Sequence, residues 1–162
     1  MLDLKNVPKE LQSAIDEKGY EKLTSVQSLV LDPGNSGKDL LVSSQTGSGK
    51  TLAYGLSISC DGLKEIIDED NKLKTLIVTP TRELALQVFN ELAWLFSKTS
   101  ITISTAIGGM DIKKERKNIE KGVDLLIGTP GRINDHIRRK TFDLNNLKSL
   151  VLDEADEMLD LG

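Results

Sequence analysis

Apolar residues in this sequence occur both in short uninterrupted runs and in longer stretches with helical spacing. Three runs are apolar without alternation, and each is followed by small, polar or acidic residues: Leu76 to Val78, Leu125 to Ile127 and Leu150 to Leu152. Such runs are typical of parallel strands that are covered on both faces. Two further segments, Leu40 to Val42 and Ile101 to Ala106, are also predicted to be strands.

Between the predicted strands, apolar residues recur at the spacing of an amphipathic helix. The clearest case is residues 82–96, where one face of a helix would carry Ala85, Val88, Phe89, Leu92 and Phe96. An alternation of strands and helices predicts an α/β fold, in which a doubly wound, mostly parallel sheet has helices on both faces.

The first part of the chain has helical spacing but no strand pattern. Residues 7–18 are predicted to form an amphipathic helix, with a proline in its first turn and a glycine just after its end. A second, short helix is expected over residues 25–31. We therefore expect residues 1–36 to be an N-terminal helical extension and residues 37–162 to be the sheet-containing domain.

Length and composition are those of one ordinary globular domain: 162 residues, of which 38% are hydrophobic and 28% charged. The longest apolar run, Leu92 to Phe96, has five residues, far fewer than the roughly 20 that a membrane span needs. The sequence starts without the features of a secretory signal, and Cys60 is its single cysteine, so we expect a cytoplasmic chain with no structural zinc. We also expect the chain to be monomeric and to have no membrane partner.

The formal net charge is −4, which argues against a protein that coats nucleic acid with a uniformly basic surface. Residues 112–140 nevertheless contain nine Lys and Arg against four Asp and Glu, a local charge of +5. Within this stretch, the basic residues at 113–117 and at 138–140 fit either a track for a polyanion or solvated helix faces.

A candidate phosphate-binding loop covers residues 43–51, between a predicted strand and a predicted helix. Its glycines would allow successive backbone N–H groups to face phosphates, Lys50 would contact the β and γ phosphates, and the Thr51 hydroxyl would bind Mg²⁺. Ser44 stands where the usual pattern has glycine, and a plain glycine–serine turn before a helix is the alternative. The candidate nucleotide ligands are Ser44, Gln45, Thr46, Gly47, Ser48, Gly49, Lys50 and Thr51.

Two acidic residues, Asp153 and Glu154, follow the predicted strand at 150–152. In an ATP-hydrolysing site Asp153 would bind Mg²⁺ together with Thr51, and Glu154 would orient and deprotonate the attacking water. With Lys50, they form the candidate catalytic set. The alternative is an acidic helix N-terminus that interacts favourably with the helix dipole.

Six sequence motifs occur in an order that resembles the N-terminal RecA-like domain of the DEAD-box ATP-dependent RNA helicases. They are residues 19–27 (the Q-motif region), 43–51, Pro80-Thr81-Arg82-Glu83-Leu84-Ala85, Gly108-Gly109, Thr129-Pro130-Gly131-Arg132 and Asp153-Glu154-Ala155-Asp156. The resemblance covers nearly the whole chain and stops shortly after Asp156.

This resemblance implies that Tyr20 packs on the adenine ring of ATP and that Gln27 contacts its polar edge. The chain departs from the family pattern at Leu23, where the family has proline, and at Leu2, where it has an aromatic residue. The resemblance also implies that the RNA backbone is contacted by Pro80, Thr81, Arg82, Gly108, Gly109, Thr129, Pro130, Gly131 and Arg132.

The expected RNA contacts have a physical rationale. Thr81 and Thr129 stand where N-caps belong after buried strands, and Pro130 suits a first helical position. Helix N-termini present N–H groups to phosphates without distinguishing bases, and Arg82 and Arg132 add positive charge. Ordinary strand-to-helix turns are the alternative at each junction.

The resemblance implies ATP and Mg²⁺ as cofactors and single-stranded or short duplex RNA, bound without sequence preference, as partner. It also implies a second RecA-like domain, which this chain lacks and to which Asp156 would couple the ATP state. We therefore expect the chain alone to have negligible ATPase activity and no unwinding activity. Another P-loop translocase and a non-catalytic binding module are the alternative functions. We interpret Trp94, Met110, His136 and Met158 as packing or surface residues.

Overall fold

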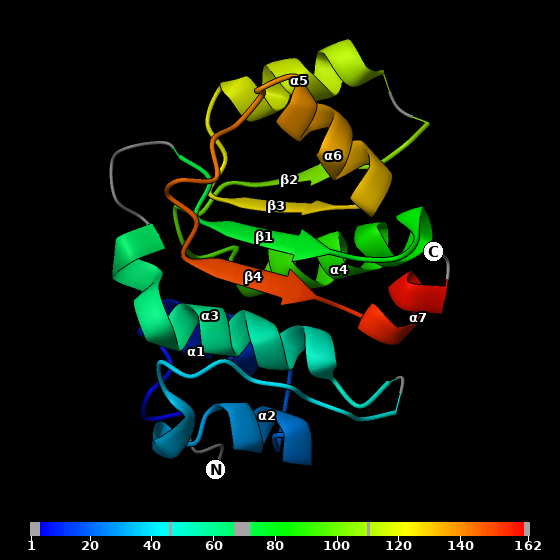
Figure 1. The fold of residues 1–162 in the computed structure, drawn as a ribbon. Coiled ribbons are helices and arrows are strands. Elements are labelled where there is room, and N and C mark those ends of the chain that lie inside the picture. Colours follow the sequence, from blue (N-terminus) through cyan, green and yellow to red (C-terminus); the bar gives the residue numbers. More distant parts are fainter. Residues whose placement is uncertain (1–3, 46, 67–71, 110, 161–162) are drawn as a thin grey trace. The chain divides into compact units, whose positions relative to one another are not determined.

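The computed structural model describes residues 4–45, 47–66, 72–109 and 111–160 (Figure 1). The chain forms two compact units, Met1–Glu65 with Glu91–Ser100, and Ile66–Asn90 with Ile101–Gly162. The expected domain division into residues 1–36 and 37–162 stays a prediction.

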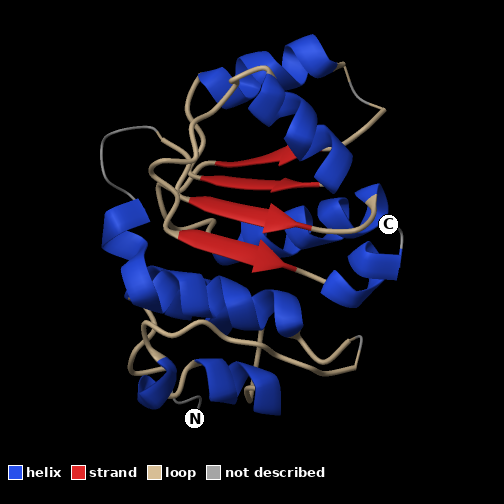
Figure 2. Cartoon of the chain, in the orientation of Figure 1, coloured by secondary structure: helices blue, strands red, loops and turns tan. Residues whose placement is uncertain are grey.

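The second unit contains a four-stranded sheet in the order β2-β3-β1-β4, in which every pair is parallel (Figure 2). Its strands are β1 (Thr75–Val78), β2 (Ile103–Ala106), β3 (Leu125–Gly128) and β4 (Ser149–Leu152). The arrowheads in Figure 1 all point the same way, so the carboxyl ends of the strands lie at one edge. The prediction of an α/β fold with a parallel sheet is confirmed.

The helices of this unit follow the strands: α5 (Ile112–Glu120), α6 (Pro130–Arg138), α7 (Ala155–Asp160) and the first part of α4 (Arg82–Leu95). One face of the sheet packs against α5 and α6 through a cluster of buried side chains: Leu73, Leu76, Ala106, Ile119, Val123, Leu126 and Ile133. Ile77, Leu125 and Ile127 alternate with this face and are almost fully buried, so the sheet is apolar on both sides.

The first unit is helical, with α1 (Lys9–Glu17), α2 (Ser25–Val30), a 3-10 turn (Pro33–Asn35), α3 (Lys50–Ile66) and the end of α4. Leu11 and Ile15 of α1 are fully buried, as expected for an amphipathic helix. A Cβ atom on Gly55 of α3 would come within 2.7 Å of the Leu92 side chain, so α3 and the end of α4 pack closely. No helix of the described residues is both long and apolar enough to cross a membrane.

One predicted strand is wrong and another is shorter than predicted. Residues 40–42 form no strand, and the side chain of Leu41 is fully exposed. An apolar run becomes a strand only where a neighbouring strand completes its backbone hydrogen bonds, and no described strand pairs with this one. The strand expected over 101–106 begins at Ile103, where its pairing with Leu125 starts.

Candidate functional site

The candidate phosphate-binding loop precedes α3, as the sequence predicts. Gly47 and Gly49 adopt φ angles of +80° and +83°, which favour glycine. The hydroxyls of Ser44 and Ser48 lie 2.8 Å apart, so serine is accommodated where the usual pattern has glycine. The Lys50 ammonium donates to the carbonyl oxygen of Ser44 at 2.8 Å and to that of Gln45 at 3.2 Å. Thr46 lies outside the described residues.

Gln27 connects this loop to the start of α2. Its Nε2 donates to the carbonyl oxygen of Gly49 at 3.2 Å, while its Oε1 accepts from the Thr24 N–H at 2.9 Å. The Gln27 N–H in turn donates to the Thr24 hydroxyl, which completes a capping box. Gln27 is buried. The spacing of Thr24 and Gln27 in the sequence is that of a capping box. The role of Gln27 at the adenine stays a prediction.

Tyr20, the expected adenine contact, stacks on another aromatic ring. Its centroid lies 6.0 Å from that of Trp94, with an angle of 21° between the ring planes. The Lys18 ammonium lies 5.2 Å from the Trp94 centroid, a favourable cation–π distance. Tyr20 remains 36% exposed, so its ring is held in place without being buried. Trp94 therefore does more than fill space: it supports the residue expected to contact the base.

In the sheet-containing unit, the expected RNA-binding residues and the acidic pair follow the carboxyl ends of neighbouring strands. Neighbouring strands lie about 4.8 Å apart, which places these junctions side by side along one edge. The strand pairing continues by one residue into the junctions after β3, β1 and β4. The bonds are Thr129 N–H to Ala106 O (3.1 Å), Thr79 N–H to Gly128 O (3.0 Å) and Asp153 N–H to Val78 O (2.9 Å). The sheet thus fixes the backbone where the candidate functional residues begin.

Asp153 and Glu154 lie between β4 and α7. Asp153 is buried, with 7% of its surface exposed, and Glu154 has a φ angle of +52°. A left-handed conformation is uncommon for a residue other than glycine, and such residues cluster at functional sites. Asp156, the expected coupling residue, is exposed in the first turn of α7.

The three expected RNA junctions have the predicted local structure. The Thr81 hydroxyl accepts from the Leu84 N–H at 3.2 Å and so caps the start of α4. Thr129 is the N-cap of α6 without a side-chain hydrogen bond, and Pro130 begins that helix. Gly109 has a φ angle of +83°, and a Cβ atom there would lie 2.5 Å from Nη1 of Arg82. The junctions after β1 and β2 are therefore in direct contact.

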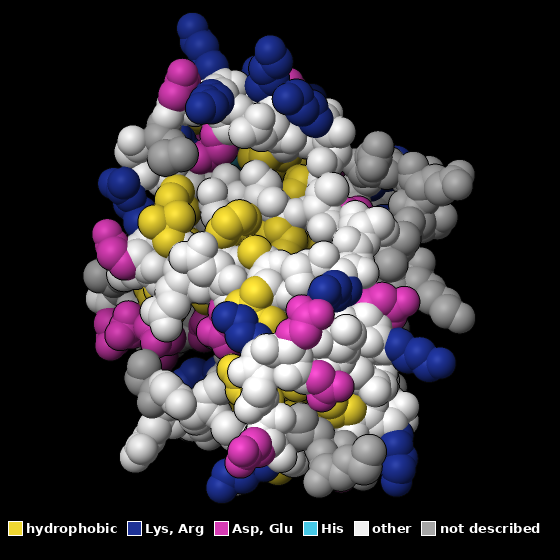
Figure 3. Space-filling model, turned by 180° about the vertical axis from the view of Figure 1, so that it is seen from behind, with side chains coloured by type: hydrophobic (Ala, Val, Ile, Leu, Met, Phe, Trp, Pro, Cys, Tyr) yellow, Lys and Arg dark blue, Asp and Glu magenta, His cyan; other side chains and the backbone are white. Residues whose placement is uncertain are grey.

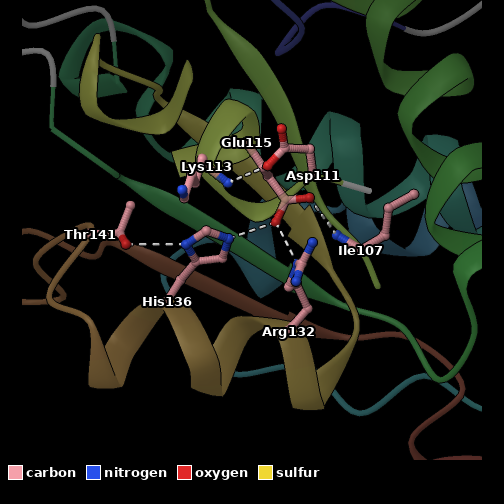
Figure 4. A network of polar contacts seen from close by, with 7 residues as sticks. All are labelled: Ile107, Asp111, Lys113, Glu115, Arg132, His136 and Thr141. Carbon is pink, nitrogen blue, oxygen red and sulfur yellow. Dashed lines mark hydrogen bonds and ion pairs between the residues drawn. The ribbon is translucent and has the colours of Figure 1, made fainter. Parts of the chain in front are cut away.

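Glu115 was missed by sequence reasoning, because it stands within the basic run at 113–117. The cations of that run are exposed, whereas Glu115 is buried and accepts a hydrogen bond from Arg132 Nε at 2.9 Å (Figure 4). Figure 3 shows Lys and Arg side chains gathered at the α5 end of the molecule. The one available signal was the spacing of Glu115 and Ile119, which places both on the same helix face.

His136 is also part of this cluster. Its ring is fully buried, with Nε2 2.6 Å from Glu115 Oε1 and Nδ1 3.1 Å from the Thr141 hydroxyl. Of the two roles expected for His136, packing or surface, its burial agrees with packing, and its hydrogen bonds were not part of that expectation.

Comparison with known proteins agrees with the resemblance of the motifs. Residues 24–162 match the family model described as DEAD/DEAH box helicase. The chain is 40% identical over 153 residues to the ATP-dependent RNA helicase CshA of Listeria monocytogenes, covering 94% of this chain and 29% of the relative. It is 43% identical over 158 residues to the ATP-dependent RNA helicase HAS1 of Chaetomium globosum, covering 97% of this chain and 27% of the relative.

Solved structures show the same fold. The yeast DEAD-box splicing factor Prp28 matches with a TM-score of 0.86 and 31% identity over 99% of this chain and 39% of Prp28. A hypothetical ATP-dependent RNA helicase from Sulfolobus tokodaii matches with a TM-score of 0.83 and 32% identity, over 95% of this chain and 43% of that protein. The chain thus spans less than a third of the two curated relatives and less than half of the two solved chains.

Proposed function

Because the chain belongs to the DEAD/DEAH box helicase family, we propose that it is the ATP-binding and RNA-binding part of an ATP-dependent RNA helicase. The relatives bear that name, and the motifs that imply it are present in this chain. Since the chain spans less than a third of these relatives, hydrolysis and unwinding are proposed for a protein of their length that carries it.

The conformation of the loop at 43–51 is the observation that carries this proposal. Gly47 and Gly49 turn the backbone with positive φ angles immediately before α3, and a Cβ atom on Gly47 would meet no atom within 4 Å. This arrangement fits a triphosphate, because the N–H groups at a helix N-terminus and a lysine are available to neutralise it. Lys50 would then exchange its two carbonyl contacts for the β and γ phosphates.

We propose that the adenine packs on Tyr20 and that Gln27 contacts its polar edge. Support comes from the stacking of Tyr20 on Trp94, which orients an exposed ring, and from the hydrogen bond that links Gln27 to the phosphate loop. The same glutamine would then be sensitive to both the base and the phosphates.

Thr51 and Asp153 are proposed to bind Mg²⁺, and Glu154 to position and deprotonate the attacking water. Hydroxyl and carboxylate oxygens suit Mg²⁺, which keeps waters and phosphate oxygens in its shell and needs few protein ligands. The bound ion would supply charge neutralisation for phosphoryl transfer.

RNA is proposed to lie along the carboxyl edge of the sheet, in contact with the junctions after β1, β2 and β3. Gly108 supports a close approach of a backbone, because a Cβ atom there would meet nothing within 4 Å. N–H groups at the starts of α4 and α6 would contact phosphates, so binding would be independent of base sequence.

We further propose a second RecA-like domain in the longer protein, coupled to the ATP state through Asp156. An arginine finger contributes about a thousandfold to hundred-thousandfold to turnover. Without one, the chain alone should bind ATP and RNA with negligible hydrolysis and no unwinding. We also propose that the chain is monomeric and that the protein is cytoplasmic, where its single cysteine would stay reduced.

The test separates ATP binding from hydrolysis in a longer protein that carries this chain. Lys50→Ala should weaken the binding of a fluorescent ATP analogue, whereas Glu154→Gln should bind it normally and lose at least about a hundredfold in RNA-stimulated hydrolysis. Lys9→Ala, which removes an exposed charge from α1, is the control. RNA-stimulated hydrolysis that survives both substitutions would refute the proposed function.

A further inference from the structure

Glu115 is a buried carboxylate in α5, a helix whose other charged residues are exposed. Its surface is 7% exposed, while Lys113, Lys114 and Arg116 around it face solvent. Burying a carboxylate is costly unless donors surround it. The contacts that compensate this cost therefore indicate what Glu115 does.

Among the described residues, the Glu115 carboxylate has polar contacts with the turn after β2 and with α6 (Figure 4). Its Oε2 accepts from the Ile107 N–H at 3.3 Å, and its Oε1 accepts from Arg132 Nε at 2.9 Å. The same Oε1 lies 2.6 Å from His136 Nε2, whose ring also contacts the Thr141 hydroxyl. Asp111 is the N-cap of α5 and accepts from the Lys113 N–H at 2.9 Å, which fixes the first turn of the helix that carries Glu115.

One of these donors lies next to an expected RNA contact, and another is itself one. Ile107 directly precedes the turn of Gly108 and Gly109 after β2, and Arg132 lies in the first turn of α6 after β3. The Glu115 carboxylate thus links the backbone of the junction after β2 to the Arg132 side chain of the junction after β3. Arg82, packed against Gly109, adds the junction after β1 to the same connected group.

The sheet alone already joins β2 to β3, since the Thr129 N–H donates to the Ala106 carbonyl oxygen. A buried ion pair also adds little stability compared with apolar residues of the same volume. A negative charge beside a phosphate-binding edge, moreover, opposes RNA binding by charge alone. These points favour a role for Glu115 in arranging the junctions over one in holding the fold together.

We propose that Glu115 is a positioning residue for RNA binding. It does not touch RNA; it sets the spacing between the turn at Gly108 and Gly109 and the start of α6, so that both meet successive phosphates. This inference rests on the proposed function.

The test compares two glutamates on the same helix. Glu120 is exposed and pairs with Arg116 at 2.6 Å, so Glu120→Ala removes the same charge from α5 without touching the buried cluster. If charge alone matters, Glu115→Ala and Glu120→Ala both bind RNA more tightly. If Glu115 positions the junctions, Glu115→Ala binds RNA about tenfold more weakly, while Glu115→Gln, which keeps an acceptor oxygen, stays within about threefold of wild type.

RNA binding is followed by the fluorescence anisotropy of a labelled single-stranded uridine oligonucleotide over a series of KCl concentrations. Each phosphate contact to a single strand contributes about 0.7 to the slope of log K against log salt, so losing a phosphate ligand lowers that slope. Because one junction would no longer meet its phosphate, Glu115→Ala should lower the slope by up to about 0.7 and leave the affinity for an ATP analogue unchanged. In a longer protein that carries the chain, it should raise KM for RNA and leave kcat at saturating RNA unchanged.

Folding of each variant is checked by circular dichroism. If Glu115→Ala does not fold, Glu115→Met, which has similar length and no acceptor oxygen, takes its place; loss of the fold in both would overturn the proposal, because Glu115 would then be needed for the fold itself. A folded Glu115→Ala that binds RNA as tightly as Glu120→Ala would overturn it too. A wild-type chain that binds ATP but no RNA would refute the proposed function, and this inference with it.

Discussion

The side-chain amide of Gln27 donates a hydrogen bond to the carbonyl oxygen of Gly49 over 3.2 Å, and so connects the start of α2 to the candidate phosphate-binding loop. The Gly49 carbonyl oxygen also accepts from the Ala53 N–H in the first turn of α3. A displacement of the Gly49 carbonyl oxygen would therefore affect hydrogen bonds to both α2 and α3.

Replacing the amide of Gln27 should impair ATP binding without removing the helix cap. In Gln27→Glu, one carboxylate oxygen still accepts from the Thr24 N–H, but the other would face the Gly49 carbonyl oxygen in place of a donor. We expect the affinity for a fluorescent ATP analogue to fall about tenfold, the effect of roughly one lost buried hydrogen bond.

The control for this prediction is Thr24→Ala, which removes the other half of the capping box. It should lower the free energy of unfolding by about 1 kcal/mol and leave the affinity for ATP close to wild type. An equal loss of ATP affinity in both variants would show that the cap, and not the contact to Gly49, matters for the nucleotide.

Gly49→Ala should destabilise the nucleotide-free chain more than Gly47→Ala. Both glycines have positive φ angles, so both substitutions cost about 1–2 kcal/mol in backbone conformation. Only at Gly49 would the new Cβ atom also lie 2.4 Å from Gln27 Nε2. Urea denaturation should show an additional loss of about 1 kcal/mol for Gly49→Ala. Equal losses would mean that Gln27 moves aside at no cost.

Elements whose signal is local could be predicted from the sequence. The apolar runs at 76–78, 125–127 and 150–152 lie within β1, β3 and β4, and the helical spacing at 82–96 matches α4 to within one residue. The run at 40–42 carries the same local signal, yet it is not a strand. Whether such a run pairs depends on a neighbouring strand, which is a property of the tertiary structure and not of the run.

The phosphate loop, the caps and the strand-end junctions were predictable because each depends on a few adjacent residues. Contacts between distant residues were not. Nothing in a basic run indicates that Glu115 turns inward to Arg132, and nothing near Tyr20 indicates that Trp94 supports its ring. These contacts depend on how helices pack against one another, whereas the sequence pattern predicts only which face of each helix is apolar.

The two glycines after β2 should differ in what they contribute. In Gly109→Ala, the alanine would have to adopt an unfavourable positive φ angle, and its Cβ atom would displace the Arg82 guanidinium. Stability and RNA binding should therefore both fall. In Gly108→Ala, the Cβ atom would enter open space, so the free energy of unfolding should stay within about 0.5 kcal/mol of wild type.

RNA binding of Gly108→Ala then tests the proposed approach of the RNA backbone. A methyl group between the loop and a phosphate should lower the affinity several-fold although the chain is unperturbed. Anisotropy titrations that give the wild-type affinity for Gly108→Ala would place the RNA away from this turn.

Gly128→Ala should be among the more destabilising single substitutions in the sheet. A Cβ atom there would lie 2.4 Å from the Ala106 carbonyl oxygen and 2.9 Å from Ile133 Cγ1, and a backbone atom within a strand pair has little room to yield. Overpacking of this kind typically costs about 1–3 kcal/mol, which urea denaturation would detect. The control is Gly131→Ala in the first turn of α6, where a Cβ atom meets nothing within 4 Å and alanine should stabilise the helix by up to about 1 kcal/mol. If both variants unfold at the wild-type urea concentration, the close pairing of β2 and β3 is not what requires glycine at position 128.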